Sequence, residues 1–174
     1  MSNHSELMKF VKEYPDFPKP GITFRDVFPM FSDPQALQSL VDACVDIVSR
    51  GSRPDVILGV ESRGFLLAPL IAYKLGIGFA PVRKVGKLPG RTACESYDLE
   101  YGQDSIEVQV DSFKPGQNVV VLDDLIATGG TLSATCKLAK KLGANVISCL
   151  TIVELKDLGG RAKIDAPVFS LITY

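Results

Sequence analysis

The amino-acid sequence predicts an α/β fold in which helices flank a mainly parallel, twisted sheet. Two strand–helix–strand units stand in order along the chain, and a longer insertion separates them. In each unit the first strand ends in polar residues that lead into a helix, at 61–64 and at 123–131. Because ligands of parallel α/β sheets bind at the carboxyl ends of the strands, we expect these two turns to form one site.

Length and composition favour a single domain over residues 1–174, long enough to bury a large core. Lysine and arginine number 19 against 20 acidic residues, so the chain lacks the positive field that nucleic-acid or anionic-membrane binding usually requires. No apolar run approaches the ~18 residues of a membrane span, and the N-terminus lacks the apolar core of a signal peptide. We therefore expect a cytoplasmic protein.

The cysteines and the single histidine do not predict a zinc site, because no CxxC spacing occurs. Cys44, Cys136 and Cys149 lie in apolar patterns and are expected in the core. Cys94 lies in a polar stretch and is expected to be exposed.

The first part of the chain predicts an arm followed by a helix. Residues 6–12 have a short helical pattern, and the proline-rich stretch 14–21 is expected to be an extended loop. A second helix is expected to begin with Asp33 as its N-cap and Pro34 at its first position, and to end at Gly51.

The first unit consists of a strand at 56–60, a helix at 65–75 closed by Gly76, and a strand at 79–83. The insertion at 85–102 is rich in glycine, proline and charge, which is typical of a lid. Alternating side chains at 96–101 predict a hairpin arm that continues to a strand at 105–110.

The second unit begins with four consecutive apolar residues at 119–122, which predict a strand buried on both faces. A helix follows from about Thr131 to Gly143, and a second buried strand is expected at 144–155. A polar loop then leads to a final strand at 167–172.

The turn at 127–131 is predicted to bind a phosphate. A turn of small residues that opens a helix presents free backbone N–H groups, and glycines let an anion approach the main chain closely. Asp123 and Asp124 precede it, and carboxylates accept hydrogen bonds from vicinal hydroxyls or hold a hydrated divalent cation. The combination suggests ribose 5-phosphate, although a capped turn without a ligand is the alternative interpretation.

Basic residues near the two turns are candidates for binding a diphosphate. Arg63 offers a planar fork of donors that matches diphosphate oxygens. The alternative is that Arg63 is a surface side chain that forms an ion pair with Glu61. Arg83, Lys84 and Lys87 cluster at the base of the insertion.

The run VVVLDDLIATGGT at 119–131 resembles the phosphoribosyl-diphosphate signature of the type I phosphoribosyltransferases. FRDV at 24–27, ESRGF at 61–65, RKVGKLPG at 83–90 and SYDLEYG at 96–102 resemble the adenine-specific branch of that family. The resemblance extends from about Tyr14 to the C-terminus. It implies the type I fold with a flexible loop or hairpin over the active site, an N-terminal arm at 1–30 that contributes to the purine pocket, and a homodimer.

The implied reaction transfers the 5-phosphoribosyl group from phosphoribosyl diphosphate to adenine and yields AMP and diphosphate. Magnesium would be held mainly by the substrate, and no direct protein ligand is assigned to it. The resemblance implies that Glu100 is the active-site carboxylate, which transfers the purine's proton or only orients the base, and that Tyr101 and Arg63 act beside the reacting centre. The binding residues expected are Ala127, Thr128, Gly129, Gly130 and Thr131 for the 5-phosphate; Asp123 and Asp124 for the ribose; Arg63, Arg83, Lys84 and Lys87 for the diphosphate; and Phe24, Arg25, Leu125 and Leu155 for adenine.

Two other functions remain open at this point. The base could be hypoxanthine, guanine or xanthine, because base choice depends on a few pocket contacts while the phosphate site is shared. The chain could also be a non-catalytic regulator that senses phosphoribosyl diphosphate. A regulator would be expected to carry an added basic domain, and the sequence shows none.

Overall fold

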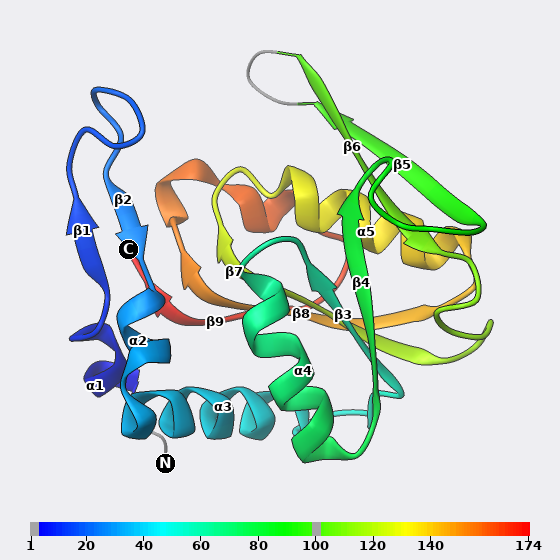
Figure 1. Cartoon of the computed structure of the whole chain (residues 1–174), viewed down its shortest axis with the longest axis horizontal. Coiled ribbons are helices and arrows are strands. Elements are labelled where there is room, and N and C mark those ends of the chain that lie inside the picture. Colours follow the sequence, from blue (N-terminus) through cyan, green and yellow to red (C-terminus); the bar gives the residue numbers. More distant parts are fainter. Residues whose placement is uncertain (1–3, 99–101) are drawn as a thin grey trace.

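The computed structural model describes residues 4–98 and 102–174, and its centre is a seven-stranded sheet (Figure 1). The strand order is β5-β6-β4-β3-β7-β8-β9. The five strands from β4 to β9 in this order run parallel, whereas β6 is antiparallel to both β4 and β5. The predicted mainly parallel sheet is therefore confirmed. The strands are β3 (Val56–Val60), β4 (Gly78–Lys84), β5 (Thr92–Asp98), β6 (Gln103–Gln109), β7 (Asn118–Ile126), β8 (Asn145–Glu154) and β9 (Val168–Thr173).

Helices cover both faces of the sheet (Figure 1). Helices α3 (Pro34–Val48) and α4 (Gly64–Leu75) pack on one face, and α5 (Gly130–Lys141) packs on the other. Successive side chains of a strand point to opposite faces, so Val120 packs with α3 and α4 while Val119 and Val121 pack with α5. This arrangement explains why 119–122 is uninterrupted apolar sequence, as predicted.

Helix α3 begins as its sequence predicts. The side chain of Asp33 accepts hydrogen bonds from the backbone amides of Gln35 and Ala36, and Pro34 occupies the first helical position. Helix α4 ends at Gly76, whose φ of 64° is the left-handed conformation that glycine tolerates best.

The N-terminal arm differs from its prediction. Helix α1 covers only His4–Met8, and Lys12–Tyr14 forms strand β1, which pairs with β2 (Phe24–Asp26) in a separate antiparallel ladder. The expected helix over 6–12 is wrong beyond Met8 because the backbone of Lys12 pairs with Asp26, a long-range contact that local periodicity does not reveal. A five-residue helix, α2 (Phe28–Ser32), was not predicted.

The insertion does form the predicted hairpin, but its strands start earlier than expected. Strand β5 begins at Thr92 and pairs with β6 through Ser96 opposite Ser105. Glu100 and Tyr101 lie outside the described residues. The polar loop after β8 contains two 3₁₀ turns, η1 (Lys156–Leu158) and η2 (Gly160–Lys163).

The cysteines lie as the apolar patterns predict. Cys44, Cys136 and Cys149 are buried, and Cys94 is exposed on β5. Across residues 4–98 and 102–174, no helix is both long and apolar enough to cross a membrane.

Candidate active site

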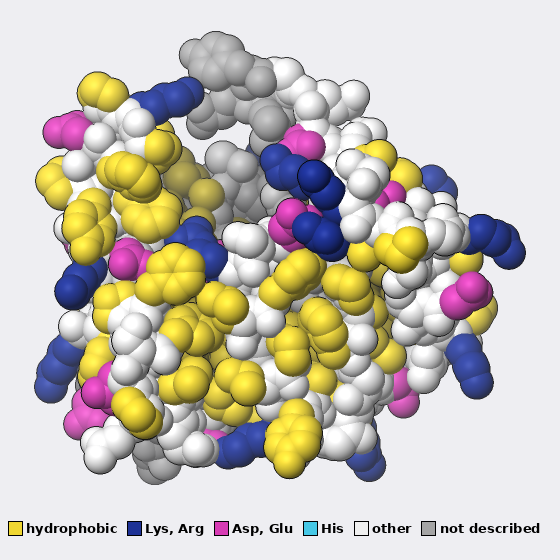
Figure 2. All heavy atoms as spheres, viewed as in Figure 1, with side chains coloured by type: hydrophobic (Ala, Val, Ile, Leu, Met, Phe, Trp, Pro, Cys, Tyr) yellow, Lys and Arg dark blue, Asp and Glu magenta, His cyan; other side chains and the backbone are white. Residues whose placement is uncertain are grey.

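The carboxyl ends of β3, β4 and β7 open into one cleft of about 400 Å³. Figure 2 shows a hollow between the arm and the β5–β6 hairpin, with charged side chains gathered at its side towards β4. The two polar turns therefore meet at one edge of the sheet, as expected for parallel strands. The predicted residues that line the cleft are Arg63, Arg83, Lys84, Asp123, Asp124, Leu125, Ala127, Thr128, Gly129, Gly130 and Thr131.

The phosphate turn lies at the N-terminus of α5. Gly129 precedes the helix with a φ of 77°, a conformation that side chains disfavour. The turn is also braced from within the helix, because the Thr135 hydroxyl donates to the Thr131 carbonyl at 2.8 Å. The first amides of a helix have no intrahelical acceptor, so this turn can donate them to an anion in the cleft.

The acid pair that precedes the phosphate turn is partly neutralised by Arg63. The Nε atom of Arg63 lies 2.8 Å from Oδ2 of Asp124, whose side chain is buried. Burial raises the pKa of Asp123 well above its usual value, and repulsion from Asp124 raises it further. The two carboxylates thus differ: Asp124 has a cationic partner, and Asp123 gains the most from a new positive or hydrogen-bonding ligand.

Arg63 does not pair with Glu61, so that alternative interpretation is wrong. Besides its contact with Asp124, its guanidinium lies over the ring of Phe24, 5.1 Å from the centroid. Its Nη1 is buried, and no group among the described residues accepts a hydrogen bond from it. An unused guanidinium donor at a cleft is suited to an anionic oxygen.

Glu61 pairs instead with Arg83, and both residues line the cleft. The Nε of Arg83 donates to Oε2 of Glu61 at 2.9 Å, and its Nη1 donates to the carbonyl of Lys87 at 3.2 Å. The hydrogen bond from Arg83 lowers the pKa of Glu61 despite partial burial. Arg83 therefore connects the end of β3 with the turn that carries Lys87. Lys87 itself does not line the cleft in this structure.

Lys84 has an acidic partner that the sequence did not reveal. Its Nζ lies 3.0 Å from Oδ2 of Asp104 on β6, and this hydrogen bond raises the pKa of Lys84. Tyr97 on β5 donates from its hydroxyl to Asp104 at 3.4 Å. Asp104 and Tyr97 both line the cleft but were not predicted, because the hairpin register that brings them there depends on strand pairing.

The turn at 86–88 is held by a buried carboxylate, Glu107 of β6. Its Oε1 accepts hydrogen bonds from the backbone amides of Lys87 and Leu88, each at 2.8 Å, and the residue is 3% exposed. Burial alone would raise the pKa of Glu107, but hydrogen bonds from the amides of Leu88, Lys87 and Gly86 and from the side chain of Thr92 together outweigh burial and hold the pKa below its usual value. In the sequence, this contact is indicated only by the presence of an acid in a strand with apolar neighbours.

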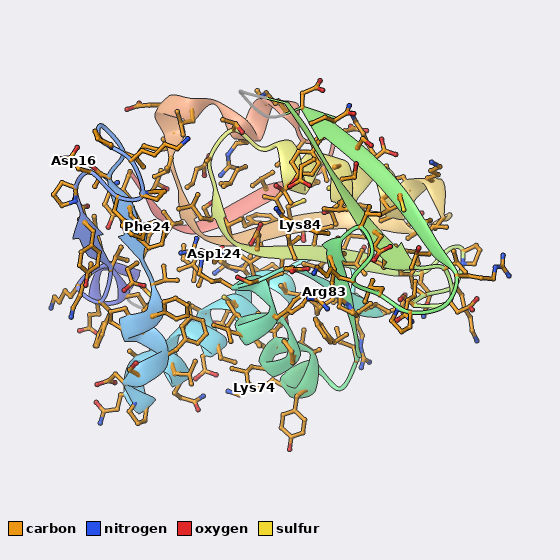
Figure 3. The ribbon with its side chains drawn as sticks, turned by 45° about the horizontal axis from the view of Figure 1, so that its top comes forward. Asp16, Phe24, Lys74, Arg83, Lys84 and Asp124 are labelled. Carbon is orange, nitrogen blue, oxygen red and sulfur yellow. The ribbon has the colours of Figure 1, made fainter. Side chains whose placement is uncertain are left out.

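The expected adenine residues come from three elements. Phe24, on the arm, reaches Arg63 and packs edge-to-face on Phe17, and Leu125 lines the cleft. The Arg25 guanidinium faces the ring of Tyr174 at 4.3 Å, and Leu155 adjoins β7 through its amide, which donates to Ile126 at 2.9 Å. In Figure 3, Asp124 lies between Phe24 on one side and Arg83 and Lys84 on the other.

Comparisons with known proteins find a matching family model and similar proteins. The model of the phosphoribosyl transferase domain family matches residues 31–173. An adenine phosphoribosyltransferase from Desulfitobacterium hafniense is 52% identical over 167 residues, which cover 95% of this chain and 96% of that protein.

Two solved structures are also similar. Adenine phosphoribosyltransferase from Saccharomyces cerevisiae, complexed with adenine and an imino-altritol bisphosphate, superposes with a TM-score of 0.93 at 43% identity and covers 97% of each chain. The enzyme from Trypanosoma brucei, in complex with AMP, pyrophosphate and ribose-5-phosphate, gives a TM-score of 0.89 at 29% identity and covers 97% of this chain and 78% of that one.

Proposed function

The chain belongs to the phosphoribosyl transferase family, within its adenine phosphoribosyltransferases, and on that premise we propose how its cleft transfers a 5-phosphoribosyl group to adenine. The products are AMP and diphosphate, so the reaction salvages a free purine base. The observation that carries the proposal is the meeting of the phosphate turn, the acid pair and Arg63 in one cleft. The relatives' shared name favours adenine over hypoxanthine, guanine or xanthine and favours an enzyme over a non-catalytic sensor.

The 5-phosphoribosyl group is proposed to bind along β7 and the turn that follows. The amides at 127–131 hold the 5-phosphate at the start of α5, and Asp123 and Asp124 accept hydrogen bonds from the ribose hydroxyls. A bound hydroxyl donor would stabilise the charge of Asp123, which burial and then repulsion from Asp124 disfavour in the empty site.

The diphosphate is proposed to bind between β3 and β4. Arg63 offers the unpartnered Nη1, and Lys84 and Lys87 add positive charge from the end of β4 and the following turn. Arg83 contributes mainly by holding the Lys87 turn, because its guanidinium is already bonded to Glu61 and Lys87. Two aspartates at the cleft provide carboxylate oxygens, the kind of ligand that Mg²⁺ prefers, and the ion would neutralise negative charge on the diphosphate. Asp123 and Asp124 would hold it through the sugar hydroxyls or water, while the substrate supplies most of its ligands.

In the reaction, the bond between the anomeric carbon and the diphosphate oxygen breaks, and the electron pair leaves with the diphosphate. A purine nitrogen forms the new bond to that carbon and then loses its proton. Glu100 is the proposed acceptor of this proton, with Tyr101 beside the reacting centre. The placement of both substrates supplies much of the rate enhancement, up to ~7–11 kcal/mol of the barrier.

The arm at 1–30 is proposed to close the purine end of the cleft. Phe24 lies over the Arg63 guanidinium, so the base pocket and the diphosphate site share one side chain. The side chain of Arg25 is engaged with Tyr174 and with Glu13, 3.3 Å away, and the contact proposed with the base is through its main chain on β2. Leu125 and Leu155 would cover the base from β7 and the end of β8.

A homodimer is proposed through the outer face of α4. Leu66, Leu70 and Tyr73 recur at helical spacing and are 42%, 38% and 87% exposed, and Phe79 of β4 is 36% exposed beside them. Figure 2 shows a continuous hydrophobic area on this side of the molecule. An exposed apolar patch of this kind is typical of a protein interface.

The cytoplasmic location expected from the sequence stays a prediction.

The test is an assay with phosphoribosyl diphosphate, Mg²⁺ and each of adenine, hypoxanthine, guanine and xanthine in separate reactions. Product from adenine alone is expected. Product from another base instead would contradict the adenine pocket but keep the phosphate site. Tight binding of phosphoribosyl diphosphate without product from any base would identify a sensor.

A further inference from the structure

A second pair of glycines lies directly behind the phosphate turn. Gly159 and Gly160 follow η1, and Gly160 opens η2. A methyl group placed on Gly160 would lie 2.2 Å from the carbonyl oxygen of Ala127 and 2.7 Å from the amide nitrogen of Gly129. Carbon atoms in contact normally stay roughly 3.5–4.0 Å from their neighbours. The backbone of Gly160 therefore touches the backbone of the phosphate turn with no side chain between them.

The contact is reciprocal. A methyl group on Gly129 would lie 2.3 Å from the carbonyl oxygen of Gly160. Gly129 also has a φ of 77°, so it is constrained both by its own conformation and by its neighbour. The position of the turn and the position of Gly160 thus determine each other.

The segment after Gly160 is anchored and cannot retreat freely. The Nε of Arg161 donates to Oε1 of the buried Glu154 at 2.9 Å, and its Nη1 donates to the carbonyl of Val168. The Ser133 hydroxyl of α5 donates to the carbonyl of Lys163 at 2.9 Å. Since β8, β9 and α5 all hold η2, a side chain at Gly160 would move the phosphate turn at least as much as the segment that carries it.

We propose that Gly160 is a positioning residue for the 5-phosphate: its bare backbone fixes, from behind, where the amides of the phosphate turn point. The proposal rests on the function proposed above. Gly160 does not line the cleft. It acts through the turn, and a displacement of about 1 Å at a substrate-positioning element can lower the rate ~10²-fold. The effect falls on ligands that carry a 5-phosphate and spares the diphosphate, which binds at the far side of the cleft.

The test compares Gly160→Ala with Gly159→Asn. Gly159 is the adjacent glycine, an added methyl group there meets no atom within 4 Å, and asparagine tolerates its left-handed φ of 63°. Calorimetry measures the Kd of ribose 5-phosphate and of diphosphate with Mg²⁺ separately, and steady-state kinetics measure KM for each substrate. Circular dichroism checks that each variant is folded.

We expect Gly160→Ala to weaken the binding of ribose 5-phosphate by about tenfold or more and to raise KM for phosphoribosyl diphosphate correspondingly. Diphosphate affinity and KM for adenine should stay within about twofold, as should all values for Gly159→Asn. Unchanged ribose 5-phosphate affinity in Gly160→Ala, or an equal loss for both ligands, would overturn the proposal. A wild-type protein that neither binds ribose 5-phosphate nor turns over would instead contradict the proposed function.

If Gly160→Ala does not fold, Ser133→Ala takes its place. This change removes only the hydroxyl that holds Lys163. It should weaken the binding of ribose 5-phosphate by about threefold to tenfold, which corresponds to the free energy of one lost hydrogen bond, and leave diphosphate affinity unchanged. Equal affinities in wild type and Ser133→Ala would count against the positioning role.

Discussion

Replacing Glu107 with alanine should loosen the turn that carries Lys87. The change removes the acceptor of two backbone amides, those of Lys87 and Leu88, each 2.8 Å from Oε1. Hydrogen bonds to charged groups contribute ~1.5–3 kcal/mol each, so two lost bonds give about 3–6 kcal/mol. Water that reaches the freed amides lowers this figure, so we expect about 3–4 kcal/mol less free energy of unfolding. Glu107→Gln retains a carbonyl acceptor and should lose roughly half as much.

The functional consequence should fall on the diphosphate. Arg83 bonds to the carbonyl of Lys87, so a mobile turn releases Lys87 and removes one of the contacts that hold Arg83, which keeps its bonds to Glu61. Urea unfolding gives the stability change, and calorimetry should show diphosphate about tenfold weaker while ribose 5-phosphate affinity is preserved. Glu95→Ala is the control, because Glu95 lies on β5 and its carboxylate is 3.9 Å from Lys141, a long ion pair; the variant should lose under ~1 kcal/mol. The reasoning is refuted if Glu107→Ala unfolds at the same urea concentration as Glu95→Ala and binds diphosphate equally well.

Three further predictions concern other parts of the molecule. Leu70→Glu places a charge in the apolar face of α4 and should convert a dimer to a monomer in light scattering after gel filtration; an unchanged mass would exclude this face as the interface. Arg63→Lys keeps the charge but loses the planar fork, so diphosphate affinity should fall about tenfold by calorimetry, and equal affinity would remove Arg63 from that site. The folded-state pKa of Glu107 is lowered, so the stabilisation that its carboxylate provides is present above the unfolded pKa of about 4.3 and is lost as pH falls through the folded-state pKa. Glu107→Gln should lack this loss of stability when unfolding is measured across acid pH, and identical pH dependence in wild type and variant would contradict the prediction.

The sheet could be predicted because its strands have a strong local signal. Residues 56–60 and 119–122 are apolar throughout since both faces of β3 and β7 are covered by helices. The arm could not be predicted in the same way. Residues 9–12 favour a helix locally, but the pairing of Lys12 with Asp26 depends on residues 14 positions away. Helix propensity is a weak determinant of secondary structure where a short segment can pair with another strand.

The site followed from topology more than from individual residues. That both polar turns meet was predictable because parallel neighbours end at the same edge of a sheet, and β3 pairs directly with β7. The partner of Arg63 was not predictable from proximity in sequence: Glu61 is two residues away but pairs with Arg83, whereas Asp124 comes from the neighbouring strand. Asp104 and Tyr97 depend in the same way on hairpin register.

The two supports of the site lie outside the cleft and on different elements. Gly160 stands behind the phosphate turn, and the carboxylate of Glu107 stands behind the Lys87 turn, so in the proposed binding mode each holds the backbone of a turn that binds one end of the same substrate. Among the described residues they share no partner, and such independent sites usually contribute additively. In Gly160→Ala/Glu107→Gln, the losses in free energy of binding phosphoribosyl diphosphate should therefore add to within about 0.5 kcal/mol. A substrate with an anion at each end needs its two binding turns fixed at a set separation, and supports that hold the turns from outside the cleft provide that without placing further charge in it.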